Sequence, residues 1–580
     1  MTTEVPEFPS PSIVDSRRLL GANIYDRRPG VVLEVTCDAT IADARYDAWT
    51  KQVAAFAHAL GWGDTDVRVR RDSHGASLFI VAPVDVLMTA TEVNEQAWVA
   101  AESGDDVDEH TINRLRSAAD AERSTRPNFA EIYAGGIARG ISTNFDDDSI
   151  CLGSGIGART YPFAELPPLS DIPRRTIHDI PIALVTGSNG KTTTTRLVAA
   201  MCRARGRVTG WCCSDGVWVD DEQLESGDYS GPAGAREVLR DSRVEAAVLE
   251  TARGGILRRG LAMTRASAAI ITNISADHFG EYGIESLSEL AEVKGVVADV
   301  LTDEDARLIL NADDPQLVAL ARNITVPVSW FSMDSENTHV DLSAAAYEVA
   351  EVIDGRIIFR SNGVSHDIGV VAEMPLTLAG TAKHNIANLL GACLLGVAMG
   401  VPIDDIRDTA MTFGSSPADN PGRLQLWRFG GVTVLTDYAH NPDGLAALVT
   451  TAKGLPATRR LLILGQAGNR DDESLRALPK AALEISHFDR VIIKEMAAML
   501  RGRAPGEVPR ILGEALIELG VSPDQIEVAP SEIAAVRHAL AWARDGDLLV
   551  CPVHVSKAEV SALLRKLQDS GWEPDATLPA

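Results

Sequence analysis

The chain has 580 residues, and 81 acidic residues against 54 basic ones give it a net charge of −27. Such an acidic excess leaves no broad basic field, which argues against nucleic acid or an anionic membrane as a partner. The length, with 45% hydrophobic and 23% charged residues, predicts a globular protein of three or four domains. Seven cysteines without a CxxC spacing, and an N-terminus without a signal-peptide pattern, predict a reduced, cytoplasmic location.

The N-terminal region has the pattern of a small α+β domain. Between residues 40 and 60 the large apolar residues recur at helical spacing before Gly61, at Tyr46, Trp49, Val53, Phe56 and Leu60. The apolar run Leu78–Ala82 predicts a strand that Pro83 ends. We therefore predict an N-terminal domain over residues 1–165.

A proline-rich polar segment, Tyr161–Ile180, is interpreted as a linker. Beyond it, short aliphatic runs alternate with helical patterns, and the runs are Ile182–Val185, Ala246–Leu249, Ala268–Thr272 and Arg307–Leu310. This alternation predicts a mostly parallel sheet with helices on both faces, in a central domain over residues 166–418.

A second break at Phe413–Arg423 precedes a C-terminal region with the same alternation. Its apolar runs are Val432–Thr436, Leu461–Leu464, Arg490–Ile493 and Asp547–Val550. We predict a separate Rossmann-like α/β domain over residues 419–580. The predicted fold class of the whole chain is α/β, with an α+β domain in front of two α/β domains.

The strongest local signal is the segment Ile182–Leu197, IALVTGSNGKTTTTRL. An apolar strand enters a loop from Gly187 to Gly190 and a helix follows, so backbone amides and the helix N-terminus can bind phosphate oxygens. Lys191 adds a positive charge, and the hydroxyl of Thr192 can bind Mg²⁺. The spacing differs from the full GxxxxGK[ST] pattern, since Val185 stands five residues before Gly190. The segment predicts a nucleotide-phosphate site in the central domain.

The loop TGSNGKTTT resembles the P-loop of the Mur ligase superfamily, which also includes folylpolyglutamate synthetases and the C-terminal half of cyanophycin synthetase. The further motifs of that family follow in order, at Glu250, Ile271–Lys294, Leu310–Pro315, Gly380–Asn388, Asn420–Arg423 and Asp437–Pro442. Seven motifs in order make the likeness specific from about residue 181 onward.

Three segments resemble cyanophycin synthetase in particular: Ile150–Arg159, Glu250–Arg258 and Arg501–Glu507. In that enzyme an ATP-grasp domain separates the N-terminal region from the Mur ligase half. Here the chain passes from one to the other within about twenty residues. The resemblance is therefore to the N-terminal domain plus the Mur ligase half, without the ATP-grasp domain.

The resemblance implies ATP and Mg²⁺ as cofactors and assigns roles to particular residues. It implies nucleotide contacts for Gly187, Asn189, Gly190, Lys191, Thr192, Thr193, Asn385, Asn388, Arg423 and Asp437. It implies metal ligands at Thr192, Glu250, His278 and Lys294. It implies catalytic roles for Lys191, His278, Lys294 and Arg423.

Each of these roles has a simpler structural alternative. A lone histidine such as His278 is by default buried and satisfied by neighbours. Lys294 matches the lysine that many Mur ligases carry as a carbamate, whereas the alternative is an exposed helix lysine. Helix capping alone would explain Asn385 or Asn388, though less easily both. The family pattern GRxE is altered to end at Gln425, which leaves the role of that position open.

The amine site is expected in the C-terminal domain, where Gly468–Ser474 and the residues Glu495, Arg501, Arg503 and Glu507 resemble cyanophycin synthetase. Their carboxylates could bind a guanidinium or ammonium group. The alternative is that they form salt bridges between domains.

The resemblance implies a ligase that joins a carboxylate to an amine through an acyl phosphate, adding an amino acid to an acidic peptide or a small acceptor. One alternative is ligation to a folate or a cell-wall precursor, and another is a catalytically inactive, nucleotide-binding regulatory homologue. The expected partners are these small molecules, with neither nucleic acid nor membrane. The N-terminal domain either holds a long acceptor or supports a homo-oligomer.

Overall fold

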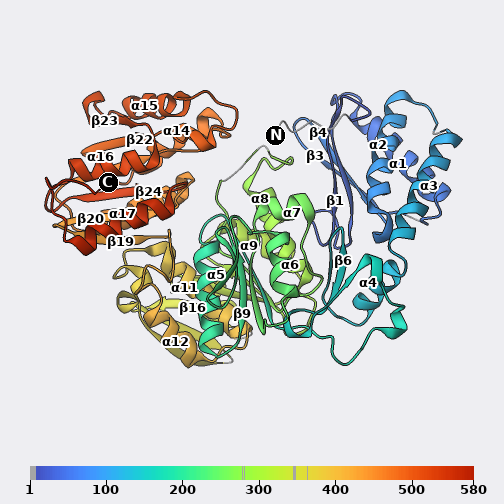
Figure 1. The fold of residues 1–580 in the computed structure, drawn as a ribbon, viewed down its shortest axis with the longest axis horizontal. Coiled ribbons are helices and arrows are strands. Elements are labelled where there is room, and N and C mark those ends of the chain that lie inside the picture. The colour runs from blue at the N-terminus through green and yellow to red at the C-terminus, as the bar shows by residue number, and fades with distance from the viewer. Residues whose placement is uncertain are drawn as a thin grey trace.

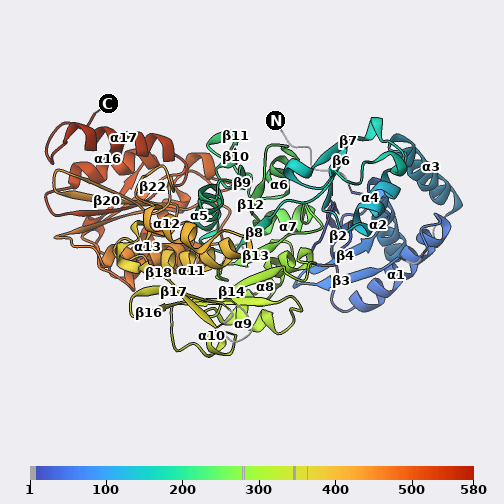
Figure 2. The same cartoon turned by 90° about the horizontal axis from the view of Figure 1, so that it is seen from below.

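The computed structural model describes residues 8–63, 65–106, 108–276, 279, 281–343, 348–361 and 363–579. The central domain lies between the other two, with the N-terminal domain at one end and the C-terminal domain at the other (Figure 1, and from below in Figure 2). The α/β fold class predicted from the sequence is confirmed.

The N-terminal domain is built on an antiparallel sheet of order β1-β2-β4-β3. Its strands are β1 (Ile13–Leu19), β2 (Gly30–Thr36), β3 (Val67–Arg71) and β4 (Gly75–Val81). The helices α1 (Ala42–Ala59) and α2 (Leu87–Ser103) pack on it. The Trp49 indole of α1 donates to Asn94 of α2 over 2.9 Å, and Asn94 donates to the Leu78 carbonyl of β4 over 2.9 Å. The predicted helix and strand are both confirmed.

The proline-rich segment is not a free linker, which corrects the interpretation from the sequence. It follows the helices α3 (Glu109–Thr125) and α4 (Phe129–Ala138) and a small sheet of β5 (Thr143–Phe145), β6 (Ser149–Leu152) and β7 (Arg159–Pro162). Phe163, Ile172 and Ile177 are buried in the N-terminal core, and Ile180 is buried in the central core. The sequence did not indicate their burial, because these apolar residues are separated by prolines and polar residues and follow neither a helix nor a strand pattern.

The central domain contains an eleven-stranded sheet of order β11-β10-β9-β12-β8-β13-β14-β15-β16-β17-β18. The strands from β9 to β16 in this order are parallel, as predicted: β9 (Thr209–Cys213), β12 (Ala246–Glu250), β8 (Ile182–Thr186), β13 (Ala268–Ile271), β14 (Arg307–Asn311), β15 (Val328–Ser332) and β16 (Val349–Ile353).

Antiparallel strands extend both edges of this sheet, and the sequence reading missed them. One edge carries β10 (Gly216–Val219) and β11 (Glu222–Ser226), and the other carries β17 (Arg356–Ser361) and β18 (Val364–Val370). Polar residues dominate β11 and β18, so they have no long apolar run to mark them.

Helices cover both faces of the central sheet, as predicted. One face carries α6 (Pro232–Arg240), α7 (Arg253–Arg259), α8 (Leu287–Gly295) and α9 (Pro315–Ala321), and the other carries α5 (Lys191–Ala204), α11 (Lys383–Ala398) and α12 (Ile403–Thr412). α10 (Thr338–Ser343) lies against β15 and β16. Within β8, Leu184 packs into one core and Val185 into the other, as alternation along a strand requires.

The C-terminal domain has a six-stranded sheet of order β19-β20-β24-β21-β22-β23, parallel except at β19. Its strands are β19 (Gln425–Phe429), β20 (Val432–Asp437), β21 (Arg460–Leu464), β22 (Arg490–Lys494), β23 (Ile526–Ala529) and β24 (Leu548–Pro552). Its helices are α13 (Pro442–Lys453), α14 (Asp472–Leu483), α15 (Glu507–Glu518), α16 (Glu532–Trp542) and α17 (Lys557–Ser570).

Among the helices of the described segments, none combines the length and the apolar character needed to cross a bilayer. The apolar helix α11 is buried along much of its length, and its buried residues pack against the central sheet.

Candidate active site

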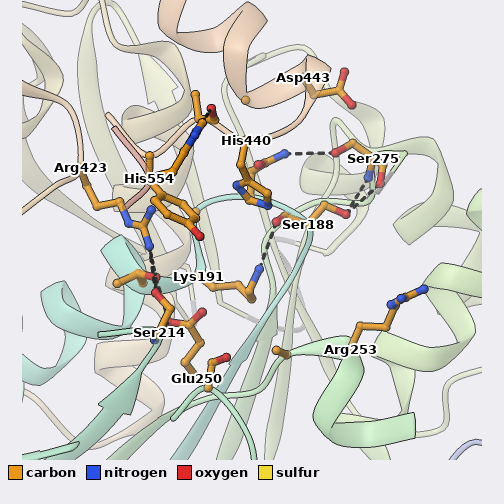
Figure 3. A pocket seen from close by; sticks show the side chains of 18 of the residues that line it. Ser188, Lys191, Ser214, Glu250, Arg253, Ser275, Arg423, His440, Asp443 and His554 are labelled. Atoms are coloured by element: carbon orange, nitrogen blue, oxygen red, sulfur yellow. Dashed lines mark hydrogen bonds between the residues drawn. The ribbon is translucent and has the colours of Figure 1, made fainter. Parts of the chain in front are cut away.

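A cavity of about 820 Å³ lies where the central strands β8, β12 and β13 end and the C-terminal domain begins (Figure 3). In parallel α/β sheets, ligands bind beyond the carboxyl ends of the strands. The volume lies within the range that small-molecule sites have. Every described residue to which the resemblance assigns a nucleotide, metal or catalytic role lines this cavity except Gly187, whose carbonyl accepts from the Lys191 ammonium.

The loop after β8 requires glycine at two positions. Gly187 and Gly190 have φ angles of 145° and 85°, which a side chain disfavours. A Cβ at Gly187 would collide with Thr272, and one at Gly190 would collide with the Asn388 amide. Because the backbone stays bare, the amides at the start of α5 can approach an anion closely.

Two ammonium groups converge beneath this loop. Lys191 donates its Nζ to the carbonyls of Gly187 over 3.0 Å and Ser188 over 3.1 Å. Lys294, at the end of α8, donates its Nζ to the same Gly187 carbonyl over 2.9 Å. Two positive charges and a helix N-terminus at one loop favour a polyanion such as a polyphosphate.

Lys294 is only 3% exposed, so the alternative of an exposed helix lysine is wrong. Burial beside the loop does not test whether Lys294 carries a carbamate, so that role stays a prediction. His278, the other predicted metal ligand of this region, lies outside the described residues.

Thr192 and Glu250 form the oxygen-rich side of the cavity. Glu250 ends β12 and is 2% exposed, and the hydroxyl of Thr192 donates to its Oε2 over 2.9 Å. Burial raises the pKa of Glu250, while the positive charges of Lys191 and Arg423 oppose that shift.

These two side chains fit Mg²⁺ as the family implies it. A hydroxyl and a carboxylate are hard oxygen donors, and Mg²⁺ in nucleotide sites takes one or two protein oxygens and completes its shell with phosphates and water. Within the described segments no three His, Cys, Asp or Glu side chains gather as a metal cluster.

Asn385 and Asn388 face the cavity from the first turns of α11. The helix begins after Ala382 without a side-chain cap, so the capping alternative is wrong for both asparagines. Asn385 donates to the Leu376 carbonyl over 3.0 Å, and Asn388 donates to the Asn385 Oδ1 over 3.1 Å. The two side chains form a polar edge of the cavity. Their contact with adenine stays a prediction.

His384 lies between these asparagines and the C-terminal domain. Burial lowers the pKa of its imidazole, while the nearby Asp437 opposes that shift.

The C-terminal domain contacts the loop after β8 (residues 187–190, here called the phosphate loop) and the start of α5 through Asn441 and Arg423. Arg423 donates its Nη2 to the Thr192 hydroxyl over 3.1 Å and to the Ser214 hydroxyl over 2.9 Å, while Asn441 donates to Asn189 over 3.1 Å. In Figure 3 Arg423 points from the C-terminal side toward Ser214.

Asp437 ends β20, and its two oxygens accept from the backbone N–H groups of Leu424 and Ala439, each over 2.7 Å. Its carboxylate thus holds together the two backbone segments at the start of the C-terminal domain. The contact with ribose stays a prediction.

The predicted amine-site residues divide into two groups. Arg501 lines the cavity, but Glu495, Arg503 and Glu507 do not. Arg503 pairs with Asp472 and Glu507, each over 2.7 Å, within its own domain. Arg503 and Glu507 thus form salt bridges, but inside the C-terminal domain, so the alternative of salt bridges between domains is wrong for these two residues.

Sequence reasoning missed an ion network that joins the two domains beside the cavity. Asp215, in the turn after β9, accepts from Arg196 of α5 and from Lys557 of α17, each over 2.7 Å. Burial opposes ionisation of Asp215, but Lys557, Arg196 and Arg423 together hold the pKa of its carboxyl below the ordinary value. Nothing in the sequence around Asp215 connects it to Lys557, more than three hundred residues away.

A family model described as the Mur ligase middle domain matches residues 185–396, and one described as the Mur ligase, glutamate ligase domain matches residues 422–552. Together they cover more than half of the chain. The chain belongs to the Mur ligase family. The two Mur ligase segments coincide with the central sheet and the C-terminal sheet, and they carry the residues that line the cavity. The resemblance predicted from the sequence is confirmed.

Two curated relatives and one solved structure illustrate the likeness. The cyanophycin synthetase of Crocosphaera subtropica is 39% identical over 388 residues, which are 65% of this chain and 43% of the relative. The cyanophycin synthetase of a Nostoc species is 37% identical over 391 residues, 67% of this chain and 43% of the relative. The chain thus spans less than half the length of these relatives. The E. coli FolC complex with DHPP and ADP is 18% identical, with a TM-score of 0.48, and the match covers 67% of this chain and 89% of that one.

Proposed function

We propose that this chain is an ATP-dependent ligase that joins a carboxylate to an amine and releases ADP and phosphate. The observation that carries the proposal is the convergence of two oppositely charged groups at one hydroxyl. The Thr192 hydroxyl contacts Glu250 of the central sheet and Arg423 of the C-terminal domain, at the start of the helix that follows the phosphate loop. A more distant curated relative, 26% identical over 374 residues, is named a UDP-N-acetylmuramoyl-L-alanyl-D-glutamate–2,6-diaminopimelate ligase, and that name supports an amino acid as the amine and a peptide-like acid as the acceptor.

The reaction needs activation, because an ionised carboxylate has no good leaving group. A carboxylate oxygen of the acceptor attacks the γ-phosphorus of ATP, and the bond to ADP breaks, which leaves an acyl phosphate. The amine nitrogen then attacks the carbonyl carbon, phosphate leaves, and the proton of the amine passes to solvent. Such transfers depend mainly on positioning and on neutralising phosphate oxygens.

The residues of the cavity suit this chemistry. The loop amides and the ammonium of Lys191 would bind phosphate oxygens, and Arg423 would add a charge from the C-terminal domain. Thr192 and Glu250 would hold Mg²⁺, joined by His278 and by Lys294 as a carbamate. When bound, the metal ion would neutralise phosphate oxygens and orient them for transfer. Asn385 and Asn388 would face the base, and Asp437 the ribose.

The C-terminal domain would also protect the acyl phosphate from hydrolysis. Arg423 and Asn441 already bring this domain onto the phosphate loop. A closed cavity excludes water and strengthens the electrostatic interactions inside it.

The direct test supplies the purified chain with ATP, Mg²⁺, acidic acceptors and single amino acids. ADP release is expected only when both substrates are present, with a product whose mass equals their sum less one water. Lys191→Ala and Glu250→Ala should lose the coupled reaction. Lys566→Ala, which changes an exposed lysine of α17, should retain it. Coupled turnover that survives in Lys191→Ala would disprove the proposal.

The same experiment separates the alternatives. Turnover with folates or cell-wall precursors, but not with acidic peptides, would assign a different acceptor. ATP binding without ADP release under any combination would identify an inactive, nucleotide-binding homologue.

A further inference from the structure

Helix α7 forms the wall of the cavity opposite the C-terminal domain. Figure 3 shows Arg253 of this helix on the side away from Arg423, with Lys191 and Glu250 between them. Gly254 and Arg258 of the same helix also line the cavity, and they lie four residues apart on one helix face. A Cβ at Gly254 would meet no atom within 4 Å, so there is open space beside the helix one turn before Arg258.

Arg258 is held from one side only. Its Nε donates to the hydroxyl of Tyr282 over 2.7 Å, and its guanidinium carbon lies 5.8 Å from the centre of that ring. Among the described residues, neither of its Nη groups forms a hydrogen bond. Because Arg258 lines the cavity, its guanidinium has two donor groups available there, in the fork geometry that matches a carboxylate.

The N-terminal domain fixes this arrangement. Arg17 of β1 lies over the ring of Tyr282, with its guanidinium carbon 4.7 Å from the ring centre. It also donates its Nε to the Leu257 carbonyl of α7 over 2.9 Å and pairs with Glu34 over 2.7 Å. The backbone of Leu20 donates to the Arg259 carbonyl over 2.7 Å. The edge of the N-terminal sheet thus sets the position of α7.

We propose that Arg258 binds a carboxylate of the acceptor, so that this ligase selects acceptors that carry an acidic group besides the one that reacts. Arg17 and Tyr282 are positioning residues that hold Arg258 in the cavity wall. The inference rests on the proposed function, because it assigns the acceptor class of the same cavity. An acidic peptide fits this wall better than a neutral one, since a guanidinium fork forms two charge-assisted hydrogen bonds with one carboxylate.

The test compares tetra-aspartate with its counterpart in which all but one side chain is asparagine. Arg258→Ala should raise KM for tetra-aspartate by roughly tenfold or more, the effect of losing a charge-assisted pair, and should change kcat little. KM for the mostly neutral peptide should change much less. The matched control is Arg259→Ala, which removes the same charge from the adjacent position of the same helix; both arginines are exposed, but Arg259 does not line the cavity.

Two further variants keep the helix intact. Tyr282→Phe removes only the hydroxyl that holds Arg258 and should raise KM for tetra-aspartate by a few-fold without lowering kcat. Gly254→Ala favours the helix and should narrow the space before Arg258, again raising KM. If Arg258→Ala and Arg259→Ala have the same KM for tetra-aspartate, the inference is wrong.

Calorimetric binding of tetra-aspartate separates this inference from the proposed function. Absence of ADP release with every acceptor would defeat the proposed function alone. Binding to the unmodified chain that weakens about tenfold in Arg258→Ala, and not in Arg259→Ala, would still support the inference. Equal binding by both variants, or no binding of tetra-aspartate to the unmodified chain, would overturn it.

Discussion

The buried pair of Lys494 and Glu532 gives the sharpest stability prediction. The two side chains are 0% and 3% exposed, and the Lys494 ammonium donates to Glu532 over 2.5 Å. The carboxylate also accepts from the backbone N–H groups of His554, Val555 and Ser556, over 2.7, 2.8 and 2.6 Å. Glu532→Gln should therefore leave a buried ammonium without its counter-charge and free the loop that brings His554 to the cavity.

The magnitude follows from the pKa of Glu532. Burial alone would raise it, but Lys494 and the backbone amides outweigh burial and lower the pKa from 4.5 to about 2. At about 1.4 kcal/mol per unit, the ionised form contributes roughly 3 kcal/mol near neutral pH. Because the folded-state pKa is depressed, this stability is complete above pH 4.5 and disappears as the pH falls toward 2. Burial lowers the pKa of Lys494, so desolvation of the ammonium offsets part of the pair's net value.

Removing one partner costs more than the pair contributes, about 3–5 kcal/mol, because the other charge stays buried. For a domain of this size, roughly 3 kcal/mol corresponds to a fall in Tm of about 6–12 °C. Circular dichroism melts at pH 7 would measure it. The double variant Lys494→Met with Glu532→Gln should recover part of the loss, because no unpaired ammonium stays buried. Recovery should be incomplete, because the backbone amides of the loop still lack their carboxylate. A Glu532→Gln protein that melts within about one degree of its parent would refute the reasoning.

Three other outcomes are expected. Burial lowers the pKa of His554 to about 3, so the folded state holds it neutral and stability should fall by about 2 kcal/mol between pH 7 and pH 5 in urea titrations, a slope that His554→Asn should flatten. Gly190→Ala should abolish ADP binding in calorimetry while the far-ultraviolet spectrum stays unchanged, because a side chain there collides with Asn388 at a φ of 85°; tight ADP binding would contradict the phosphate role of the loop. Asp215→Asn should weaken the contact between the central and C-terminal domains and increase the radius of gyration in X-ray scattering, and an unchanged radius would show that Asp215 does not hold them together.

The sequence predicted the parts of the fold that rest on local patterns. The runs that became β8, β12, β13 and β14 are short, apolar and separated by helical patterns, so period and length sufficed to find them. Strand β11 was missed because its pattern is polar throughout, and its place depends on pairing with β10. Such pairing is a tertiary property that no window of sequence contains.

The phosphate loop was equally accessible from the sequence, since Gly187, Gly190 and Lys191 lie within five residues. The rest of the site was not. The position of Arg258 depends on the contact of Arg17 in an N-terminal strand with α7. Lys557 contacts Asp215 only because the C-terminal domain packs against the central domain. Without the resemblance to Mur ligases, neither Arg423 nor Asp437 would have been assigned to the nucleotide.

Helix α5 contacts both the phosphate loop and the segment that joins the central and C-terminal domains. Its first turn carries Thr192 and Thr193 toward the phosphate loop, and Thr193 also accepts from the Asn420 amide over 3.2 Å. One turn further, Arg196 donates to the Pro421 carbonyl over 2.9 Å, in the segment where the chain crosses into the C-terminal domain. A rigid helix transmits displacement along its whole length. A ligand bound at the loop before α5 and the angle between the two domains are therefore mechanically coupled, because the same helix contacts both the loop and the peptide that joins the domains.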